Sequence, residues 1–417
     1  MDASASTLDW LIQTLWRPDA TTPPSIRVAI GSARRVPPGD LVEQFAILPN
    51  RTHPRSLVPV GSRRVASAAM RVYNDSQRPT TRLARAVIGA GMSLGIAQQG
   101  FRDRLFVTAA SGVDRAALPA VSVTSYLTET LHEGALEAAV VFRRATPNRK
   151  PILQMIDPLG RTTAFVKIGW NELTRDLVRN EGAILRRFTD DPPSSFSVPA
   201  LRHAGPWQDL ETLAVAPLPN RFWTRQIQAT LPIEATREIA LGEGEDRRDL
   251  ATSPFRAKLL ARLDLLGGNT SRVGSAVALL NDVVRSTGVD PFRFGRWHGD
   301  WAPWNMASSN GRLYVWDWER GGGPVPLGFD AIHFAFQTAM RDLAHDASAS
   351  LDKADHASAS VWSSLGLDEE TRLATVALYL LEIYVRYEEA NVRGASADDR
   401  LPDATLRVAD QVIRRLV

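Results

Sequence analysis

Cysteine is missing from the 417-residue chain. Its absence excludes disulfide bonds, thiolate catalysis, cysteine-ligated zinc and iron–sulfur clusters together. The seven histidines show neither an H-x-H nor an H-x-x-x-H spacing, which argues against a histidine-rich transition-metal site. Cysteine-based catalysis and histidine-based metal chemistry are therefore outside the functions that this sequence favours.

Long hydrophobic runs are also missing. The stretch 86–97, which is apolar residues and glycine apart from Ser93, is well short of the roughly 18 residues that a membrane-spanning helix needs. The first residues lack the basic segment and apolar stretch that mark a secretory signal. We therefore expect a cytoplasmic protein with no membrane span.

Lysine is rare. The chain has 49 basic and 46 acidic residues, a near balance that gives no reason to expect nucleic acid as a partner. The basic surplus lies in residues 1–120, which contain 15 arginines and 8 acidic residues. Only four of the 49 basic residues are lysines, namely Lys150, Lys167, Lys258 and Lys353. Because a compact ammonium and a planar guanidinium are not interchangeable, each lysine deserves inspection.

The length predicts two or three packed units, and 44% hydrophobic residues suffice for sizeable cores. In the front segment, periodicity predicts strands and helices but no recognisable motif. The expected elements there are strands at 43–49 and 56–60 and helices at 63–73 and 80–98.

From residue 136 the pattern changes to that of an antiparallel meander followed by a helix. The three expected strands are 136–144, 151–156 and 162–168. A helix follows with Thr174 as its expected N-cap. Two more strands and a proline-rich linker come next, at 200–204, 210–216 and 216–219.

Beyond the linker the pattern is mainly helical. The expected helices are 254–266, 273–287, 328–342, 371–391 and 403–416. The Asp/Ala/Ser-rich stretch 346–360 indicates a loop, and Asn310–Gly311 predicts a type I′ hairpin. The outline is α+β: an additional N-terminal α/β segment over 1–120, an antiparallel β lobe over 121–217 and a mostly helical lobe over 218–417.

The segment 296–320 contains the residues that indicate chemistry. Asp300, Asn305 and Asp317 surround one expected hairpin, which can bring two carboxylates and an amide oxygen together. Hard oxygen ligands of this kind suit Mg²⁺. A simpler interpretation stays open: Asp300 and Asn305 cap turns, and Asp317 is a salt-bridged strand end.

The motif H-G-D-W-A-P-W-N begins at His298, and D-W-E follows twelve residues after its Asn. The combination resembles the catalytic core of the aminoglycoside phosphotransferase and choline kinase-like family, relatives of protein kinases with Asn five residues beyond the loop Asp. The resemblance implies a bilobal protein-kinase-like fold. It also implies ATP and Mg²⁺ as cofactors and a small-molecule hydroxyl as phosphoryl acceptor.

The resemblance requires a Lys on the third strand and a Glu on the following helix. Lys167 and Glu181 meet that requirement. The competing interpretation puts Lys167 on an edge strand with its ammonium reaching solvent.

The resemblance also implies a role for each matching residue. Asp300 would orient the attacking hydroxyl and accept its proton. Asn305 and Asp317 would bind Mg²⁺, and Lys167, positioned by Glu181, would contact the ATP phosphates. These residues, far apart in the chain, are expected to serve a single magnesium–nucleotide site.

Other residues have weaker assignments by the same resemblance. Ala216, in the linker, would offer backbone groups to adenine. The turn at 145–150 lacks the glycines of a protein-kinase loop, so Lys150 would supply charge there instead. Glu319 would either assist the metal or brace the hairpin, and Asp330 would either tie down the loop or act as a helix N-terminal charge.

Five tryptophans crowd the motif. Trp301 and Trp304, inside the loop, are the candidates for contact with substrate, although core packing is the commoner use of tryptophan. The acidic run 241–249 would either attract a cationic substrate or form a solvated face.

Together with these residues, the resemblance implies an ATP- and Mg²⁺-dependent phosphotransferase that acts on a hydroxyl; a sugar or related metabolite as acceptor is implied by the family analogy alone. Two alternatives stay open: an aminoglycoside-modifying phosphotransferase, and a non-catalytic pseudokinase or scaffold whose basic front segment binds an anionic partner.

Overall fold

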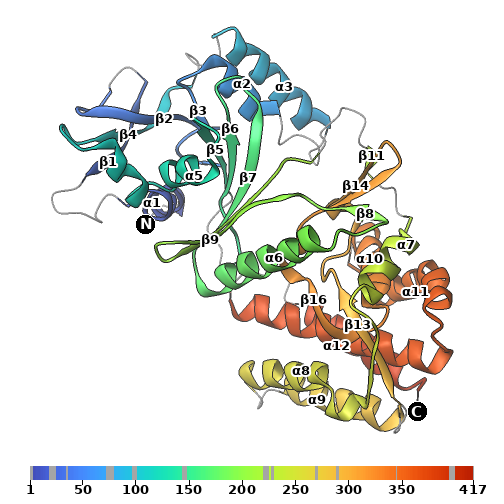
Figure 1. The fold of residues 1–417 in the computed structure, drawn as a ribbon. Helices are drawn as coiled ribbons and strands as arrows, with labels where there is room; N and C mark the ends of the chain where they lie inside the picture. Colours follow the sequence, from blue (N-terminus) through green and yellow to red (C-terminus); the bar gives the residue numbers. More distant parts are fainter. Residues whose placement is uncertain are drawn as a thin grey trace. The chain divides into compact units, whose positions relative to one another are not determined.

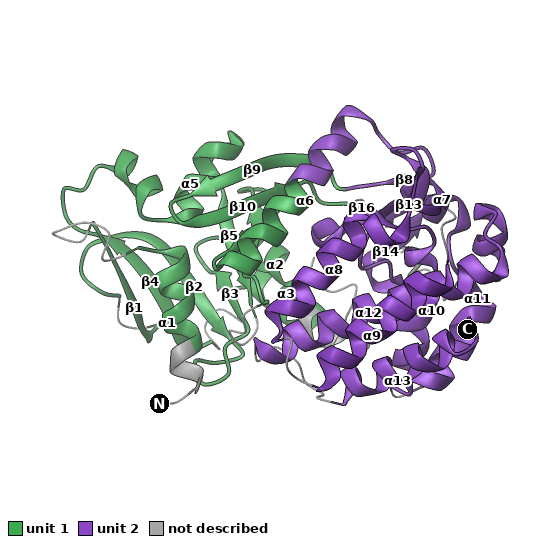
Figure 2. Ribbon diagram, turned by 90° about the horizontal axis from the view of Figure 1, so that it is seen from below, with its two compact units in different colours: residues 1–182, 199–220 green, residues 183–198, 221–417 purple. Residues whose placement is uncertain are grey.

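The computed structural model consists of two compact units (Figure 2). Unit 1 contains residues 1–182 and 199–220, and unit 2 contains residues 183–198 and 221–417. The described residues are 3–17, 25–33, 36–71, 79–95, 101–142, 148–218, 225–226, 230–267, 271–287, 291–343, 345–393 and 400–416.

Unit 1 is built on a nine-stranded antiparallel sheet with the order β1-β4-β2-β3-β5-β6-β7-β10-β9 (Figure 1). The strands are β1 (Ile26–Ser32), β2 (Asp40–Leu48), β3 (Ser56–Pro59), β4 (Asp103–Ala109), β5 (Glu137–Val141), β6 (Ile152–Ile156), β7 (Thr162–Gly169), β9 (Leu201–Trp207) and β10 (Leu210–Val215). The meander predicted from residue 136 onward is thus part of a larger sheet.

Helices cover both faces of this sheet. They are α1 (Ala3–Leu15), α2 (Arg63–Arg71), α3 (Pro79–Ser93), α5 (Val123–Leu131) and the first part of α6 (Glu172–Asp190). Because side chains alternate across a strand, β6 contributes Leu153 to the core with α1 and α5, and Ile156 to the core with α2 and α3. Figure 1 shows these two helix pairs on opposite sides of the strands.

The strands from residues 26–109 belong to the same sheet as Lys167. β3 pairs with β5 through Ser56 opposite Val141 and Leu57 opposite Val140. Local periodicity predicts β2, β3, α2 and α3 but misses α1, β1 and β4. The last two are joined by a register of seven pairs between segments more than 70 residues apart, which no local pattern reveals.

Helix α6 begins two residues before its expected N-cap. Asn171 Oδ1 accepts the N–H of Thr174 at 2.8 Å, and Thr174 Oγ1 accepts the N–H of Asn171 at 3.1 Å. This reciprocal pair makes Asn171 the capping residue and places Thr174 in the first turn. The assignment of Thr174 as N-cap is therefore wrong, although the helix itself is confirmed.

Unit 2 is mostly helical. Its remaining helices are α7 (Ile233–Leu241), α8 (Pro254–Leu265), α9 (Ser271–Ser286), α10 (Phe329–Asp342), α11 (Ala347–Leu365), α12 (Glu369–Val392) and α13 (Leu401–Ile413). The α+β class is confirmed. Within the described ranges, no helix is both long and apolar enough to cross a bilayer.

The expectation of a loop at 346–360 is wrong, because this stretch forms α11. Asp346 caps it by accepting the N–H of Ala349 at 3.0 Å, and Gly366 ends it in the left-handed region at φ 63°. Alanine is the best helix former, and the small Ser358 lets the helix approach α10 closely enough to donate to the Ala331 carbonyl at 3.3 Å.

Two small sheets interrupt the helices of unit 2. One has the order β11-β14-β15-β8 and the other β12-β13-β16. Their strands are β8 (Phe196–Ser197), β11 (Arg225–Gln226), β12 (Asp246–Arg248), β13 (Phe292–Trp297), β14 (Met306–Ser309), β15 (Arg312–Val315) and β16 (Gly322–Pro326). The β14–β15 turn has Asn310 at φ 50° and Gly311 at φ 75°, as a type I′ hairpin requires.

A chain that lacks residues 1–120 is expected to aggregate, because it would expose the β5 edge and the apolar faces that α1, α2 and α3 cover. Size-exclusion chromatography and thermal unfolding of residues 121–417, beside the 417-residue chain, measure this. A soluble monomer with cooperative unfolding would contradict the expectation.

Candidate active site

The loop between β13 and β14 depends on Gly299. Its φ is +81°, and a Cβ at this position would overlap the carbonyl oxygen of Arg320. A residue with a side chain would therefore meet both an unfavourable backbone conformation and a steric clash. The glycine of the H-G-D motif is required by the path of the loop itself.

His298 is fixed by three hydrogen bonds. Its backbone N–H donates to Asp330 Oδ2 at 2.7 Å, and its Nδ1 accepts the N–H of Asp300 at 3.2 Å. Nε2 therefore carries the ring hydrogen and donates it to the Trp316 carbonyl at 3.1 Å. Burial lowers the pKa of His298 to about 4 and outweighs the nearby charges of Asp300 and Asp317. The imidazole is thus a neutral structural part of the loop.

Asp330, in the first turn of α10, ties down the loop from the other side. Its carboxylate accepts the backbone N–H groups of His298 at 2.7 Å and Gly299 at 3.3 Å. Burial raises the pKa of Asp330 to about 7. Of the two roles considered from the sequence, the contacts support the loop tie.

Arg386 on α12 holds the carbonyl end of the same loop. It donates to the Gly299 carbonyl at 2.6 Å and to Glu382 Oε1 at 2.8 Å. Its guanidinium lies 4.4 Å from the ring centroid of Trp297. Glu382 also accepts from Arg262 of α8 at 2.7 Å. An Arg–Glu–Arg row, with a buried Glu382 between two largely buried arginines, thus connects two helices to the loop backbone.

Asp300 is held at both carboxylate oxygens. Oδ2 accepts from Asn305 Nδ2 at 2.8 Å, and Oδ1 accepts from His333 Nε2 at 3.3 Å. Its side chain remains 34% exposed. Burial raises the pKa of Asp300, but the hydrogen bonds that the carboxylate accepts from His333 and Asn305 outweigh burial and lower the pKa below its ordinary value. Asp300 is therefore an ionised, oriented and accessible base.

Asn305 presents its side-chain oxygen away from Asp300. Its Nδ2 donates to both the backbone carbonyl and Oδ2 of Asp300, each at 2.8 Å. Among the described residues, no hydrogen-bond donor reaches its Oδ1. An amide oxygen left in this way is a suitable ligand for a hard cation.

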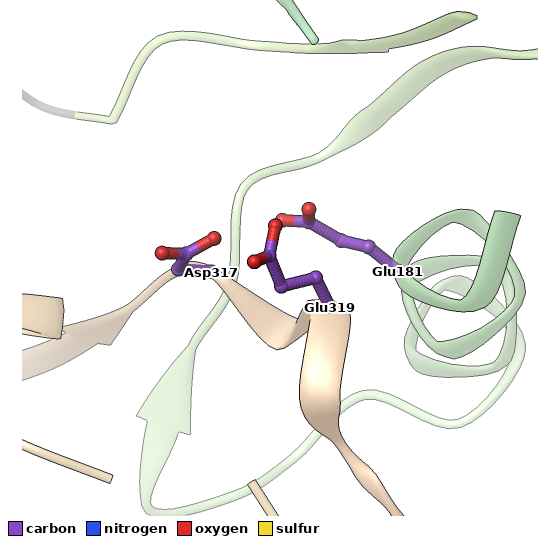
Figure 3. Close-up of side chains that lie close together, drawn as sticks. All are labelled: Glu181, Asp317 and Glu319. Carbon is purple, nitrogen blue, oxygen red and sulfur yellow. The ribbon is translucent and has the colours of Figure 1, made fainter. Parts of the chain in front are cut away.

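Asp317 and Glu319 follow β15 on the other arm of the hairpin. The N–H of Trp316 donates to the Asn305 carbonyl at 3.1 Å, so the segment that leads to Asp317 lies beside Asn305. Asp317 has φ +71°, a conformation that costs about 1–3 kcal/mol for a residue with a side chain. Its carboxylate lies within 4.8 Å of that of Glu319. Figure 3 shows both side chains on this segment.

In unit 1, Lys167 and Glu181 form an ion pair. Lys167 Nζ lies 2.5 Å from Glu181 Oε2, and the two side chains are 18% and 4% exposed. β7 lies between β6 and β10, since Lys167 is opposite both Ile152 and Leu213. The edge-strand interpretation of Lys167 is therefore wrong. Glu181 is also labelled in Figure 3, on α6.

The two other nucleotide candidates of unit 1 lie next to strands. Lys150 precedes β6, after a connection whose residues 143–147 fall outside the described part of the chain. Ala216 follows β10, and its N–H already donates to the Ala200 carbonyl at 2.8 Å.

The two tryptophans proposed for substrate contact differ. Trp301 has no exposed surface and donates its indole N–H to Thr236 Oγ1 at 3.0 Å. It is a core residue of unit 2, and this corrects its assignment as a substrate contact. Trp304 is half-buried and has the Arg341 guanidinium 5.3 Å from its ring centroid.

The acidic run 241–249 is neutralised by arginines. Glu243 forms an ion pair with Arg296, and Glu245 forms one with Arg293 at 2.5 Å. Because these carboxylates are already paired, the run gives no support to an acidic surface for a polycationic substrate.

Sequence reasoning missed His333, Tyr379 and Arg386. His333 lies three residues after Asp330, on the same side of α10. Tyr379, Glu382 and Arg386 recur at i, i+3 and i+7 on α12, a polar stripe within the mostly apolar stretch 373–387. This stripe is the sequence pattern that could have identified Tyr379 and Arg386.

No protein-family model and no curated protein matches the chain. Solved structures do. A thermostable mutant of an aminoglycoside phosphotransferase has a TM-score of 0.46 and 16% identity, covering 70% of this chain and 98% of that one. A choline/ethanolamine kinase family protein from Mesorhizobium loti has a TM-score of 0.42 and 14% identity, covering 72% and 93%.

An amicoumacin kinase in complex with AMP-PNP and Ca²⁺ is also similar, with a TM-score of 0.41 and 12% identity over 66% of this chain and 88% of that one. The likeness is one of fold, and the activities in these names belong to those proteins.

Gly299 and Gly311 have similar φ angles, so alanine substitutions at the two positions provide a matched test of the crowding at Gly299. Gly299→Ala should destabilise the protein by roughly 2–5 kcal/mol, because strain and overlap with Arg320 add. Gly311→Ala, at φ +75° with nothing within 4 Å of the added Cβ, should cost only about 1–2 kcal/mol. Urea unfolding measures both, and equal losses would contradict the crowding at Gly299.

His298 should make stability depend on pH. Because its folded pKa of about 4 lies below the ordinary 6.5, its contribution is complete above pH 6.5 and is lost as the pH falls toward 4. The loss should reach about 3 kcal/mol. Asp330, with its raised pKa, contributes a slope of opposite sign, so the measured quantity is the wild type minus His298→Gln. A difference that does not change with pH would contradict the assignment.

Proposed function

We propose that this chain is an ATP- and Mg²⁺-dependent small-molecule kinase that transfers the γ-phosphoryl group to a hydroxyl of a sugar or related metabolite. The observation that carries the proposal is the geometry of Asp300. A carboxylate fixed at both oxygens, ionised and still one-third exposed is what a base for a substrate hydroxyl requires.

Asp300 would accept a hydrogen bond from the acceptor hydroxyl and orient its oxygen for in-line attack. The proton would pass to the carboxylate as the bond from the acceptor oxygen to the γ-phosphorus forms and the bond from that phosphorus to the bridging oxygen breaks, releasing ADP. Since phosphoryl transfer needs little covalent help, most of the rate would come from this positioning and from charge neutralisation. The hydrogen bonds that fix the Asp300 carboxylate supply the positioning.

The donor set fits Mg²⁺. Asn305 Oδ1 and the Asp317 carboxylate would hold the ion, and Glu319 is near enough to Asp317 to assist. When bound, the ion neutralises charge on the phosphate oxygens. The left-handed backbone of Asp317 is the kind of local strain that accompanies a functional position.

Lys167 would contact the nucleotide phosphates. An ammonium on an internal strand is costly to bury unless a carboxylate holds it, and Glu181 does so. Lys150 and the backbone at Ala216 are the further proposed contacts of the nucleotide. Trp304, with its partly exposed ring, is the proposed contact of the acceptor.

An ADP-release assay over sugars, amino sugars, aminoglycosides and choline-like alcohols tests the function. Asp300→Asn should lower kcat by about 10²–10⁴-fold while nucleotide binding persists, because the proton acceptor is lost and the fold is not. Asp317→Asn should also weaken Mg·ATP binding. Asp342→Asn, an exposed carboxylate of α10, is the matched control and should behave as wild type.

Turnover by Asp300→Asn at the wild-type rate would contradict the role of Asp300 as the base for the acceptor hydroxyl. Nucleotide and metal binding without ADP release for any acceptor would favour the non-catalytic pseudokinase instead.

A further inference from the structure

A buried polar pair adjoins Asp300: His333, which donates to Asp300 Oδ1, and Tyr379, to which the mechanism above gives no role. His333 on α10 is 3% exposed, and Tyr379 on α12 is completely buried. Their rings meet edge to face with centroids 5.8 Å apart. Buried polar side chains cost free energy unless their hydrogen bonds are satisfied. The hydrogen-bond partners of His333 and Tyr379 therefore indicate what the two residues do.

The hydrogen bonds of His333 allow one direction only. An ionised carboxylate can only accept, so His333 Nε2 donates its hydrogen to Asp300 Oδ1 at 3.3 Å. In a neutral ring Nδ1 then has no hydrogen and must accept, and the Tyr379 hydroxyl donates to it at 3.2 Å. The Asp300 carboxylate therefore selects the tautomer, and Tyr379 supports it by holding Nδ1.

The imidazole is neutral. Burial lowers the pKa of His333, and the charges of Arg386 and Arg320 oppose its protonation, against the attraction of Asp300. A neutral donor orients the carboxylate without forming an ion pair with it. A Lys or Arg in this place would hold Asp300 equally well but would make it a weaker proton acceptor.

His333 completes the orientation of Asp300. Asn305 holds Oδ2, and a carboxylate anchored at one oxygen can still rotate about its χ2 bond. With His333 at Oδ1 the plane of the carboxylate is set. The remaining lone pairs then point in a fixed direction at the exposed part of the side chain.

We propose that His333, oriented by Tyr379, is a positioning residue that holds the Asp300 carboxylate in the plane required for proton acceptance. This inference rests on the proposed kinase function of the same site.

Steady-state kinetics of four variants test the inference. His333→Leu removes the donor and should lower kcat by about 10–100-fold, with the KM for ATP within about threefold of wild type. His333→Gln, whose amide nitrogen reaches the same place, should recover most of that loss. Tyr379→Phe should lower kcat by about 3–10-fold because Nδ1 loses the hydrogen bond that holds the His333 ring in place. His356→Leu, at an exposed position of α11, should leave kcat unchanged.

A double-mutant cycle separates positioning from a structural role. If His333 acts through Asp300, His333→Leu should cause no further loss in an Asp300→Asn background. A loss that multiplies in the double variant would overturn the inference, as would His333→Gln being as slow as His333→Leu.

A spectroscopic measurement tests the arrangement independently of turnover. The ¹⁵N shifts of His333 should report a neutral ring protonated at Nε2, the tautomer that the acceptor-only Asp300 carboxylate requires. An imidazolium or an Nδ1-protonated ring in the wild type would overturn the inference. Absence of ADP release by the wild type would contradict the kinase function and this role together, whereas normal turnover by His333→Leu contradicts the role alone.

Discussion

The structure of unit 2 depends on how the buried backbone of one short loop obtains its hydrogen bonds. The N–H groups of His298 and Gly299 and the carbonyl of Gly299 are removed from water, and each would cost about 1–3 kcal/mol if left without a partner. Asp330 satisfies the two donors and Arg386 satisfies the acceptor. Helices α10 and α12, which are distant from each other in sequence, thereby set the position of the loop. The position of Asp300 in that loop is fixed in the same way.

The same rule governs the charged residues. Lys167 lies on an internal strand, where an ammonium is stable only beside a carboxylate, and Arg386 is buried only because Glu382 accompanies it. His333 differs, since it enters the interior as a neutral group. Each unit thus contains an ion pair that stabilises a charged group, and unit 2 also holds an uncharged donor beside a carboxylate that stays ionised.

The sequence predicted most helices, the Asn310–Gly311 hairpin and the residues of the loop motif, because each has a local signature. It could not predict that β1 and β4 pair, since their register joins distant segments. It misjudged α11 because alanine and serine give little hydrophobic periodicity, and it misjudged Trp301 because burial is a property of the whole unit. His333 was missed because its role depends on contact with Asp300, which is 33 residues away in the sequence.

The nine-stranded sheet has a thermodynamic consequence. Strands that belong to one hydrogen-bonded sheet and pack on the same two cores tend to unfold together. A ligand that binds only the native form therefore stabilises all of these strands by RT ln(1 + [L]/Kd). A nucleotide held at Lys167 on β7 would then slow amide hydrogen exchange in β4 and β1, which lie five and six strands away in the sheet. These strands of the front segment would thereby report occupancy of a site on a distant strand.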